Sequence, residues 1–446
     1  MTSTGAIGST LSARIRAARP SVRGAIPVVA GIVVTISIVW GRRLQARVVD
    51  VKLGAAPLVG RWHWRSSSKL VPAIAIAVLI VAAGPTVARR ARFWVVVVLS
   101  SLVATAFSTA LAAADGGAAL LAPVVHPTEY WDNLDILPPA GEMLRQFGTR
   151  EFLVDYSPHL KGHPPGFILL LKALVSLGLR RPWIGGALSM IGVALLSVGV
   201  LIAARCVVGD DAARRFAPFL VAAPFTVWLM TSADAFYAGV FALGVALVAA
   251  GARNITSWAP VLCVFGGAVL GSSAFLSYGV VALAPLPLMI AFVGTHTSWP
   301  IRLTRVGMVG AGVVAVVLAF RVKGFWWLDG LRTTRGLYWE GTAKFRPWTY
   351  FLLGNIGALL IALGPAFSFG LARIRDRRLW VPVGTALACV ALADVSQYSK
   401  GEVERIWLTF MPWLLMAVLA LRRTRLWLGL QTATAVVLQA WLISKW

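Results

Sequence analysis

The chain has 446 residues, of which 58% are hydrophobic and only 13% are charged. This charged fraction is about half that of an ordinary soluble domain, and it excludes a soluble protein. Lys and Arg number 42 against 17 Asp and Glu, which gives a net charge of +25. Such an excess would suggest nucleic acid in a soluble protein, but here the basic residues lie at the ends of apolar runs, as cytoplasmic loops and lipid head groups require. We therefore expect membrane lipids as partners and no nucleic acid.

The N-terminal 24 residues are basic and precede the apolar run 25–40. Their arginines are Arg14, Arg16, Arg19 and Arg23. No small-residue cleavage site separates this run from the basic residues that follow it at 42–43. This pattern favours a retained anchor helix over a removed signal peptide.

Apolar runs of nearly membrane-spanning length recur along the rest of the chain. They fall at 71–88, 93–113, 185–205, 216–231, 235–251, 258–276, 279–295, 303–320, 350–372, 380–393, 404–421 and 426–443. Because some runs are short and closely spaced, we expect about 11–13 transmembrane helices in an all-α polytopic membrane protein, with juxtamembrane helices on the outer face. We divide the chain into N-terminal helices with a basic loop (1–92), a central membrane module (93–421) and a C-terminal helix (422–446).

Orientation follows from the arginines, because short cytoplasmic loops retain Lys and Arg. The basic clusters that can be cytoplasmic together are 89–92, 205–215, 253, 302–305, 373–378 and 422–425. All of these clusters can lie on the cytoplasmic side only if the apolar segment 164–179 lies along the outer interface. Its helical length of about 24 Å allows this placement. The outer loops are then 114–184, 321–349 and 394–403. Residues 41–70, although basic, also fall outside, which departs from the rule.

Acidic residues gather in the first outer loop, immediately after a membrane helix. Glu129, Asp132 and Asp135 lie within seven residues of one another. In such a cluster, neighbouring groups can adjust the pKa of one carboxylate so that it removes a proton from a sugar hydroxyl. A solvated acidic loop that caps a helix would give the same pattern.

Farther along this loop, His159, Lys161 and His163 precede two prolines that open the apolar segment 164–179. Proline is tolerated in the first turn of a helix, and the positive helix N-terminus there stabilises an anionic phosphate. Two alternatives stay open. The histidines could satisfy local hydrogen bonds in a turn, or they could hold a divalent cation with nearby acids, although Gly162 and Pro164 disfavour a helical pair of ligands. We predict no definite metal site and no definite cofactor.

An acidic cluster in the first large outer loop, followed some thirty residues later by His163-Pro164-Pro165, resembles the GT-C superfamily of integral-membrane glycosyltransferases. The resemblance is to its protein O-mannosyltransferase and aminoarabinose-transferase branch. Further similar stretches are Arg180-Arg181-Pro182-Trp183, Thr231-Ser232-Ala233-Asp234 and the charged segment 400–407. The chain departs from relatives that have adjacent Asp and Glu, because Tyr130 and Trp131 separate Glu129 from Asp132.

The resemblance implies a glycosyltransferase at the plasma membrane with its active site on the outer face. The implied donor is a mannose or arabinofuranose on a polyprenyl phosphate, and the acceptor is a glycan, glycolipid or protein of the cell envelope. Glu129 is the first choice for the base that deprotonates the acceptor, and Asp132 is the second. His159 is expected to bind substrate, and the cations expected to neutralise the departing phosphate are Lys161, His163, Arg181 and Arg405. Arg181 and Arg405 could instead be ordinary interfacial anchors.

Other polar residues could bind substrate or serve the fold alone. Asp234 could hydrogen-bond a sugar or cap a helix, and Glu402 could bind the acceptor or pair with Arg405. Tyr338 and Arg346 suit a sugar and a phosphate, although an interfacial aromatic belt explains them as well. A polytopic transporter or lipid-linked-sugar flippase is the alternative function. The near absence of charge inside the predicted spans disfavours that alternative.

Overall fold

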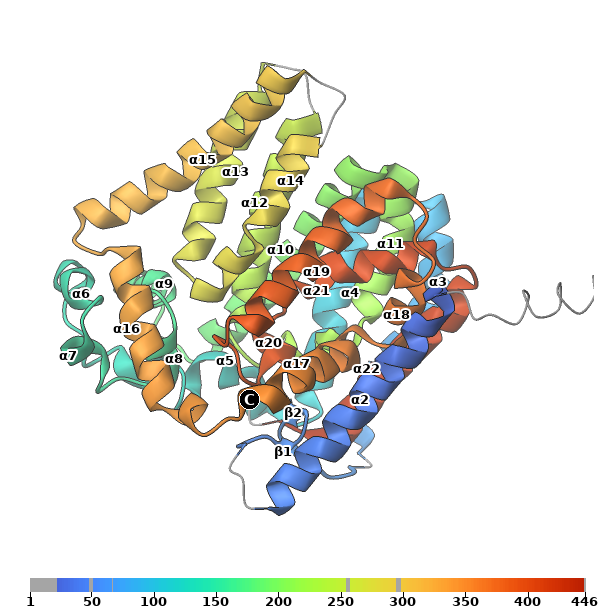
Figure 1. The fold of residues 1–446 in the computed structure, drawn as a ribbon, viewed down its shortest axis with the longest axis horizontal. Helices are drawn as coiled ribbons and strands as arrows, with labels where there is room; N and C mark the ends of the chain where they lie inside the picture. The colour runs from blue at the N-terminus through green and yellow to red at the C-terminus, as the bar shows by residue number, and fades with distance from the viewer. Residues whose placement is uncertain (1–21, 48–50, 66, 254–256, 294–297, 445–446) are drawn as a thin grey trace, which may run out of the picture.

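The computed structural model describes residues 22–47, 51–65, 67–253, 257–293 and 298–444. Most of the basic N-terminal segment, including Arg14, Arg16 and Arg19, lies outside the described residues. The described chain is almost entirely helical (Figure 1). The predicted all-α polytopic fold class is therefore confirmed.

Within the described residues, seven helical segments are long and apolar enough to cross a membrane. They are Gly24–Ala46, Ser68–Arg90, Phe93–Ala113, Trp183–Val208, Asp234–Arg253, Trp299–Val322 and Arg377–Val395. The helices concerned are α2 (Val22–Ala46), α3 (Val71–Arg90), α4 (Phe93–Ala113), α10 (Trp183–Val208), α12 (Asp234–Arg253), α15 (Trp299–Val322) and α19 (Trp380–Val395). An eighth span is formed if α17 (Trp348–Leu363) and α18 (Pro365–Leu371), which are bent by 100° at Gly364, are taken together.

The structure has fewer unbroken spans than the 11–13 expected, because prolines divide several apolar runs. The run 216–231 forms α11 (Asp210–Ala222), which ends before Pro224, and the 3₁₀ helix Pro224–Trp228. Ala223 is extended, as a residue before proline prefers. The run 404–421 is likewise divided into α20 (Val403–Ile406), α21 (Met411–Leu415) and the 3₁₀ helix Met416–Ala420. Shorter apolar segments are Gly166–Ser176, Ala259–Ala274, Tyr278–Val293 and Met411–Ala420.

The remaining elements are mostly short. The helices are α5 (Ala122–Val125), α6 (Ala140–Gln146), α7 (Arg150–Leu153), α8 (Pro158–Gly162), α9 (Gly166–Ser176), α13 (Ala259–Ala274), α14 (Pro285–Val293), α16 (Trp327–Glu340) and α22 (Thr424–Trp441). Strands β1 (Gly54–Ala55) and β2 (Leu58–Val59) form one antiparallel pair, and β3 (Arg61–Trp62) and β4 (Leu442–Ile443) form another. The second pair joins the segment after α2 to the C-terminal end of α22.

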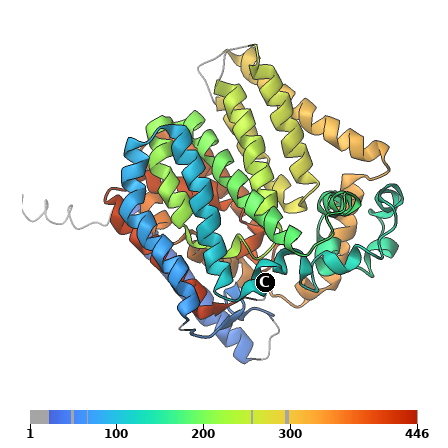
Figure 2. The same ribbon diagram turned by 180° about the vertical axis from the view of Figure 1, so that it is seen from behind.

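Helices α10 and α12 pack against each other along much of their length, and their green and yellow-green ribbons lie side by side in Figure 2. They run parallel, because Gly192 lies against the start of α12 and Gly199 lies against Ala242, farther along both helices. At their shared C-terminal end, the Arg253 side chain donates to the carbonyl of Arg205 over 2.7 Å. The first residue of α12, Asp234, therefore lies toward the opposite end of the bundle from these arginines.

Helix α9 begins directly after the two prolines at 164–165. Its 11 residues reach about 16 Å, which is too short to cross a hydrocarbon layer of about 30 Å. The length of α9 fits the expectation that residues 164–179 do not span the membrane. Its placement on the outer interface stays a prediction.

Candidate functional site

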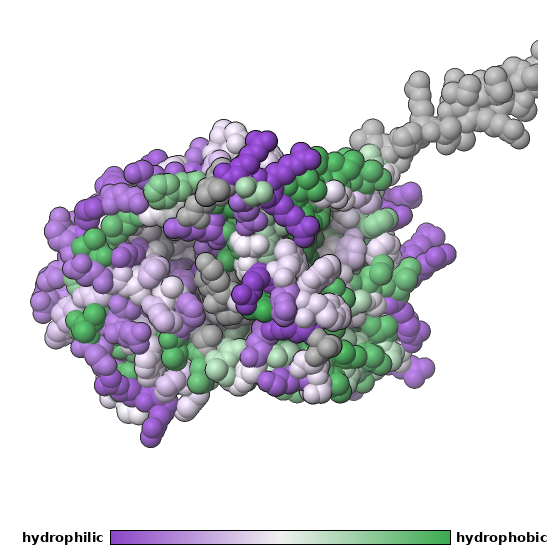
Figure 3. All heavy atoms as spheres, turned by 90° about the horizontal axis from the view of Figure 1, so that it is seen from below, coloured by the Kyte–Doolittle hydropathy of each residue, from purple (hydrophilic) through white to green (hydrophobic). Residues whose placement is uncertain are grey.

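Five of the predicted site residues meet at the end of the bundle where α12 begins. They are Glu129, His159, Asp234, Glu402 and Arg405, hereafter the carboxylate–arginine cluster. These residues come from the loop after α5, from α8, from the start of α12 and from α20 with the residue that precedes it. This end of the molecule, which carries α8, α16, α20 and the strands, faces the viewer in Figure 3, where hydrophilic residues cover much of the surface.

His159 connects a carboxylate to a guanidinium. Its Nδ1 lies 2.9 Å from Oε1 of Glu129, and its Nε2 lies 2.7 Å from a terminal nitrogen of Arg405. A guanidinium can only donate hydrogen bonds, so Nε2 of His159 must be the acceptor. Nδ1 is then the ring nitrogen that faces the Glu129 carboxylate.

Arg405 also contacts two carboxylates directly. One terminal nitrogen donates to Oδ2 of Asp234 over 2.8 Å, and the other donates to Oε2 of Glu402 over 3.1 Å. The hydroxyl of Ser232 donates to the same Oδ2 of Asp234 over 2.8 Å. Arg405 thus joins α12 to the segment before α20, and Ser232 holds the Asp234 carboxylate in place.

The local backbone explains how Glu402 reaches this position. Gly401 has φ of 88° and Glu402 has φ of 63°, so two consecutive residues adopt the left-handed region. Glycine does so without steric cost, whereas a residue with a Cβ pays roughly 1–2 kcal/mol. The turn directs the Glu402 side chain back toward Arg405, three residues later. Such strain in an ordered site indicates that surrounding contacts hold the turn.

Burial and charge distinguish the three carboxylates. The side chains of Glu129 and Asp234 are 4% and 9% exposed, whereas that of Glu402 is 24% exposed. Burial opposes ionisation of Glu402, but the Arg405 and Arg346 guanidiniums outweigh it and hold the pKa of Glu402 below its usual value. Asp234 and Glu402 both face a guanidinium, whereas Glu129 faces the His159 imidazole.

Arg346 and Tyr338 support the cluster from the second predicted outer loop. Arg346 is buried and donates through Nε to the carbonyl of Val51 over 3.2 Å, and it also donates to the carbonyl of Lys400. A terminal nitrogen of Arg346 lies 3.6 Å from Glu402. The backbone N–H of Lys400 donates to the Tyr338 hydroxyl over 2.9 Å. Both side chains therefore position the turn that carries Glu402.

His163 lies beside the cluster, next to two buried tyrosines. Its Nδ1 is 3.3 Å from the carbonyl of Leu276, and its ring is 5.3 Å from that of Tyr237. Burial lowers the pKa of His163 to about 4, because the nearby Asp234 carboxylate only partly offsets it. The Tyr130 and Tyr237 hydroxyls are 2.9 Å apart, and burial raises the pKa of Tyr130 well above its usual value. His163 and Tyr130 are both neutral near pH 7.

Three predicted residues are not brought into the cluster. Asp132 is exposed, and the Lys161 ammonium donates to the carbonyl of Val154 over 2.6 Å. Arg181 is exposed just before α10, and its side chain makes no hydrogen bond or ion pair with the residues that the structure describes. The neighbouring Arg180 pairs with Asp135 instead.

Sequence reasoning gave no role to Asn133, which connects the two halves of the first outer loop. Its amide donates to the carbonyl of Glu129 over 3.1 Å and to the hydroxyl of Ser157 over 2.8 Å. Its carbonyl oxygen accepts from the N–H of Ser157 over 3.2 Å. The acidic segment and the histidine segment are thereby held together. The sequence feature that could have indicated this role is the position of Asn133, four residues after Glu129.

A metal site was the open alternative for the two histidines. In the part of the chain that the structure describes, no group of three or more His, Cys, Asp or Glu side chains could hold a metal ion. His159 instead uses both ring nitrogens in the contacts with Glu129 and Arg405. No protein-family model, curated protein or solved structure matches this chain.

Proposed function

We propose that this protein is a membrane glycosyltransferase that moves a sugar from a polyprenyl phosphate to an acceptor hydroxyl at the end of the bundle that carries the carboxylate–arginine cluster. The observation that carries the proposal is the different pairing of the cluster's carboxylates. Asp234 and Glu402 contact the Arg405 guanidinium, whereas Glu129 contacts the His159 imidazole. We therefore assign the base to Glu129, the carboxylate that is held by the imidazole and not by the guanidinium.

A base of this kind suits an inverting transfer. Glu129 takes the proton of the acceptor hydroxyl as the hydroxyl oxygen attacks the anomeric carbon. The bond from this carbon to the lipid phosphate oxygen breaks, and the phosphate leaves with the electron pair. Arg405 supplies a buried positive charge beside the base, and such a charge stabilises a developing anion in a site that excludes water. The orientation of this site toward the outer face is part of the proposal and follows from the arginine distribution.

The direct test is transfer from labelled polyprenyl-phosphate mannose and polyprenyl-phosphate arabinose, offered separately to membranes that contain the protein. The variant Glu129→Gln keeps an acceptor for the His159 N–H but cannot take up a proton. We expect it to lose about 100-fold or more in transfer per folded molecule. Asp155→Asn, which changes an exposed acid of the same loop, is the matched control and should retain transfer.

Asp132→Asn tests the second choice of base. Loss in this variant with full transfer in Glu129→Gln would move the base to Asp132. Full transfer in both variants would remove the base from this loop.

A transporter is the second candidate, and one feature of the fold favours it. The pair α17 and α18 is bent by 100° between two apolar halves, and broken helices are common at transporter binding sites. The same labelled donors, enclosed in proteoliposomes, distinguish the two functions. Movement of intact donor between leaflets without transfer of its sugar would overturn the glycosyltransferase proposal.

A further inference from the structure

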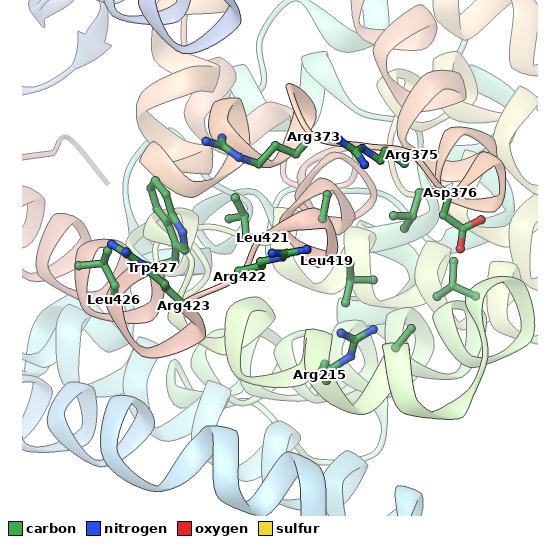
Figure 4. A pocket seen from close by; sticks show the side chains of 14 residues that line it. Arg215, Arg373, Arg375, Asp376, Leu419, Leu421, Arg422, Arg423, Leu426 and Trp427 are labelled. Carbon is green, nitrogen blue, oxygen red and sulfur yellow. The ribbon is translucent and has the colours of Figure 1, made fainter. Parts of the chain in front are cut away.

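A second polar site lies near the other end of the bundle. A cavity of about 770 Å³ opens among the C-terminal end of α10, the start of α11, the loop after α18 and the start of α22. Five described arginines line it, and Figure 4 shows them coming from three segments around one hollow: Arg215 from α11, Arg373 and Arg375 from the loop after α18, and Arg422 and Arg423 from the turn before α22. We call this hollow the arginine cavity.

The arginine cavity is separate from the carboxylate–arginine cluster. Ser189 of α10 donates to the carbonyl of Ser232, close to Asp234, whereas Val208 at the far end of α10 lines the cavity. Nineteen residues of helix separate these positions, which corresponds to about 28 Å. This is close to the thickness of the hydrocarbon layer, so the two sites lie at opposite ends of the spans.

The charge of the arginine cavity is not balanced by ion pairs within the described part of the chain. The one acid that the described residues contribute to its lining is Asp376, which pairs with Arg378, a residue outside the lining. Among the residues that the structure describes, none of the five lining arginines pairs with a carboxylate. The Arg373 guanidinium donates to the backbone carbonyl of Phe369 over 2.9 Å. Because this acceptor is neutral, the hydrogen bond leaves the positive charge of Arg373 in place. Five like charges around one hollow repel one another, and an anion between them would relieve that repulsion.

The remaining lining of the arginine cavity is apolar. It includes Leu379, Leu421, Leu426 and Trp427. The volume suits a ligand larger than a single phosphate ion. Arginine binds phosphate through two parallel hydrogen bonds, while an apolar wall accepts hydrocarbon. The cavity therefore combines the two chemistries that a phospholipid or another lipid phosphate presents.

We propose that the arginine cavity binds a phosphate group, and that this phosphate belongs to the head group of a membrane lipid. The lipid source is favoured because the charged residues and the apolar wall lie together at the ends of the membrane spans. A soluble phosphate is the other source of the same chemistry. The proposal does not depend on the reaction proposed for the carboxylate–arginine cluster.

The test uses the full chain in detergent micelles, titrated by calorimetry with dihexanoyl phosphatidic acid, dihexanoyl phosphatidylcholine and inorganic phosphate. We expect phosphatidic acid to bind most tightly. The double variant Arg375→Gln and Arg422→Gln should weaken this binding about 100-fold, or about tenfold for each charge-assisted hydrogen bond lost. The matched control, Arg89→Gln with Arg90→Gln, removes the same charge from exposed residues outside the cavity and should bind within about twofold of the wild type.

A second pair, Arg215→Gln with Arg373→Gln, changes other arginines of the same lining and should also weaken binding, so the test does not depend on the folding of one variant. Inorganic phosphate that binds as tightly as phosphatidic acid, with the same loss in the variants, would support the phosphate site and overturn its lipid source. Phosphatidic acid binding that is equal in both cavity variants and in the control would overturn the site.

Discussion

Arg405 and Asp234 lie 171 residues apart in the chain, yet a terminal nitrogen of Arg405 is 2.8 Å from Oδ2 of Asp234. Their side chains are 5% and 9% exposed. A buried ion pair gains little over apolar packing, but removing one partner leaves a buried charge without compensation. This contact therefore makes the folding of the segment before α21 dependent on its docking against the start of α12.

Arg405→Met should destabilise the protein strongly, because Asp234 would lose its guanidinium partner and Glu402 would keep only the more distant Arg346. The expected loss is about 3–5 kcal/mol, measured by denaturant unfolding in detergent micelles. The matched control is Arg332→Met, which removes an exposed arginine paired with Asp329 and should have little effect. Equal losses in the two variants would contradict a stabilising role for the buried pair.

Most of the fold was predictable because hydrophobic runs of membrane length are a property of local sequence. The runs 93–113 and 303–320 each correspond to one long helix. In other runs, a proline or a glycine explains why the expected single span is absent from the structure. Pro224 ends a helix within the run 216–231, and Gly364, with φ of 74°, allows the chain to turn within the run 350–372. The length of each of these two runs predicted a single membrane span, but the helix is interrupted within the run.

The candidate site was predictable in its residue types but not in its contacts. Polar residues outside the apolar runs or at their ends were easy to select, and Glu129, His159, Asp234 and Arg405 were among them. Their convergence depends on the packing of segments far apart in the chain, which no local pattern encodes. Lys161 and Arg181 were selected by the same rule, since they flank the helix after the prolines. In the structure, the Lys161 side chain contacts a backbone carbonyl and the Arg181 side chain is exposed.

The contact between α10 and α12 should not tolerate a side chain at Gly192. A Cβ at this position would lie 2.5 Å from the Cα of Phe236 and 2.5 Å from the carbonyl carbon of Ala235. Gly192→Ala should therefore separate the helices and cost about 1–3 kcal/mol. Because α12 begins at Asp234, the same change should weaken the contact with Arg405.

Gly310→Ala in α15 is the matched control, because nothing lies within 4 Å of its Cβ position. It should stabilise the helix by up to about 1 kcal/mol. Thermal unfolding of both variants checks the pair. A Gly192→Ala protein as stable as Gly310→Ala would show that the two helices do not need this close approach.

His163 should make stability fall at acidic pH. Burial lowers its pKa in the folded protein to about 4, against 6.5 for an ordinary histidine. Between these values the unfolded chain binds more protons than the folded one, so stability is full above about pH 6.5 and decreases as the pH falls toward 4. The decrease due to this one group is at most about 3 kcal/mol.

The measurement is the difference in unfolding free energy between the wild type and His163→Gln across pH 4–8. This difference should change through the same window, because glutamine does not titrate. A His163→Gln protein with the wild-type pH dependence would refute the neutral, desolvated state of His163.

The bridge formed by His159 leads to a prediction that separates a positioning role from a proton-transfer role. The ring accepts from Arg405 at Nε2, and its Nδ1 lies 2.9 Å from Oε1 of Glu129. A glutamine amide has both an acceptor and a donor, so His159→Gln can preserve both contacts, whereas His159→Leu removes both. The leucine variant leaves a buried carboxylate and a buried guanidinium each short of one partner, and we expect it to cost about 1–3 kcal/mol. The glutamine variant should cost clearly less.

If the proposed transfer reaction occurs, His159→Gln should also retain more activity per folded molecule than His159→Leu, because it still orients the Glu129 carboxylate. Unfolding in detergent and transfer assays on the same preparations check both statements. Equal loss of transfer in the two variants, with the glutamine protein fully folded, would mean that the imidazole itself carries a proton in the reaction.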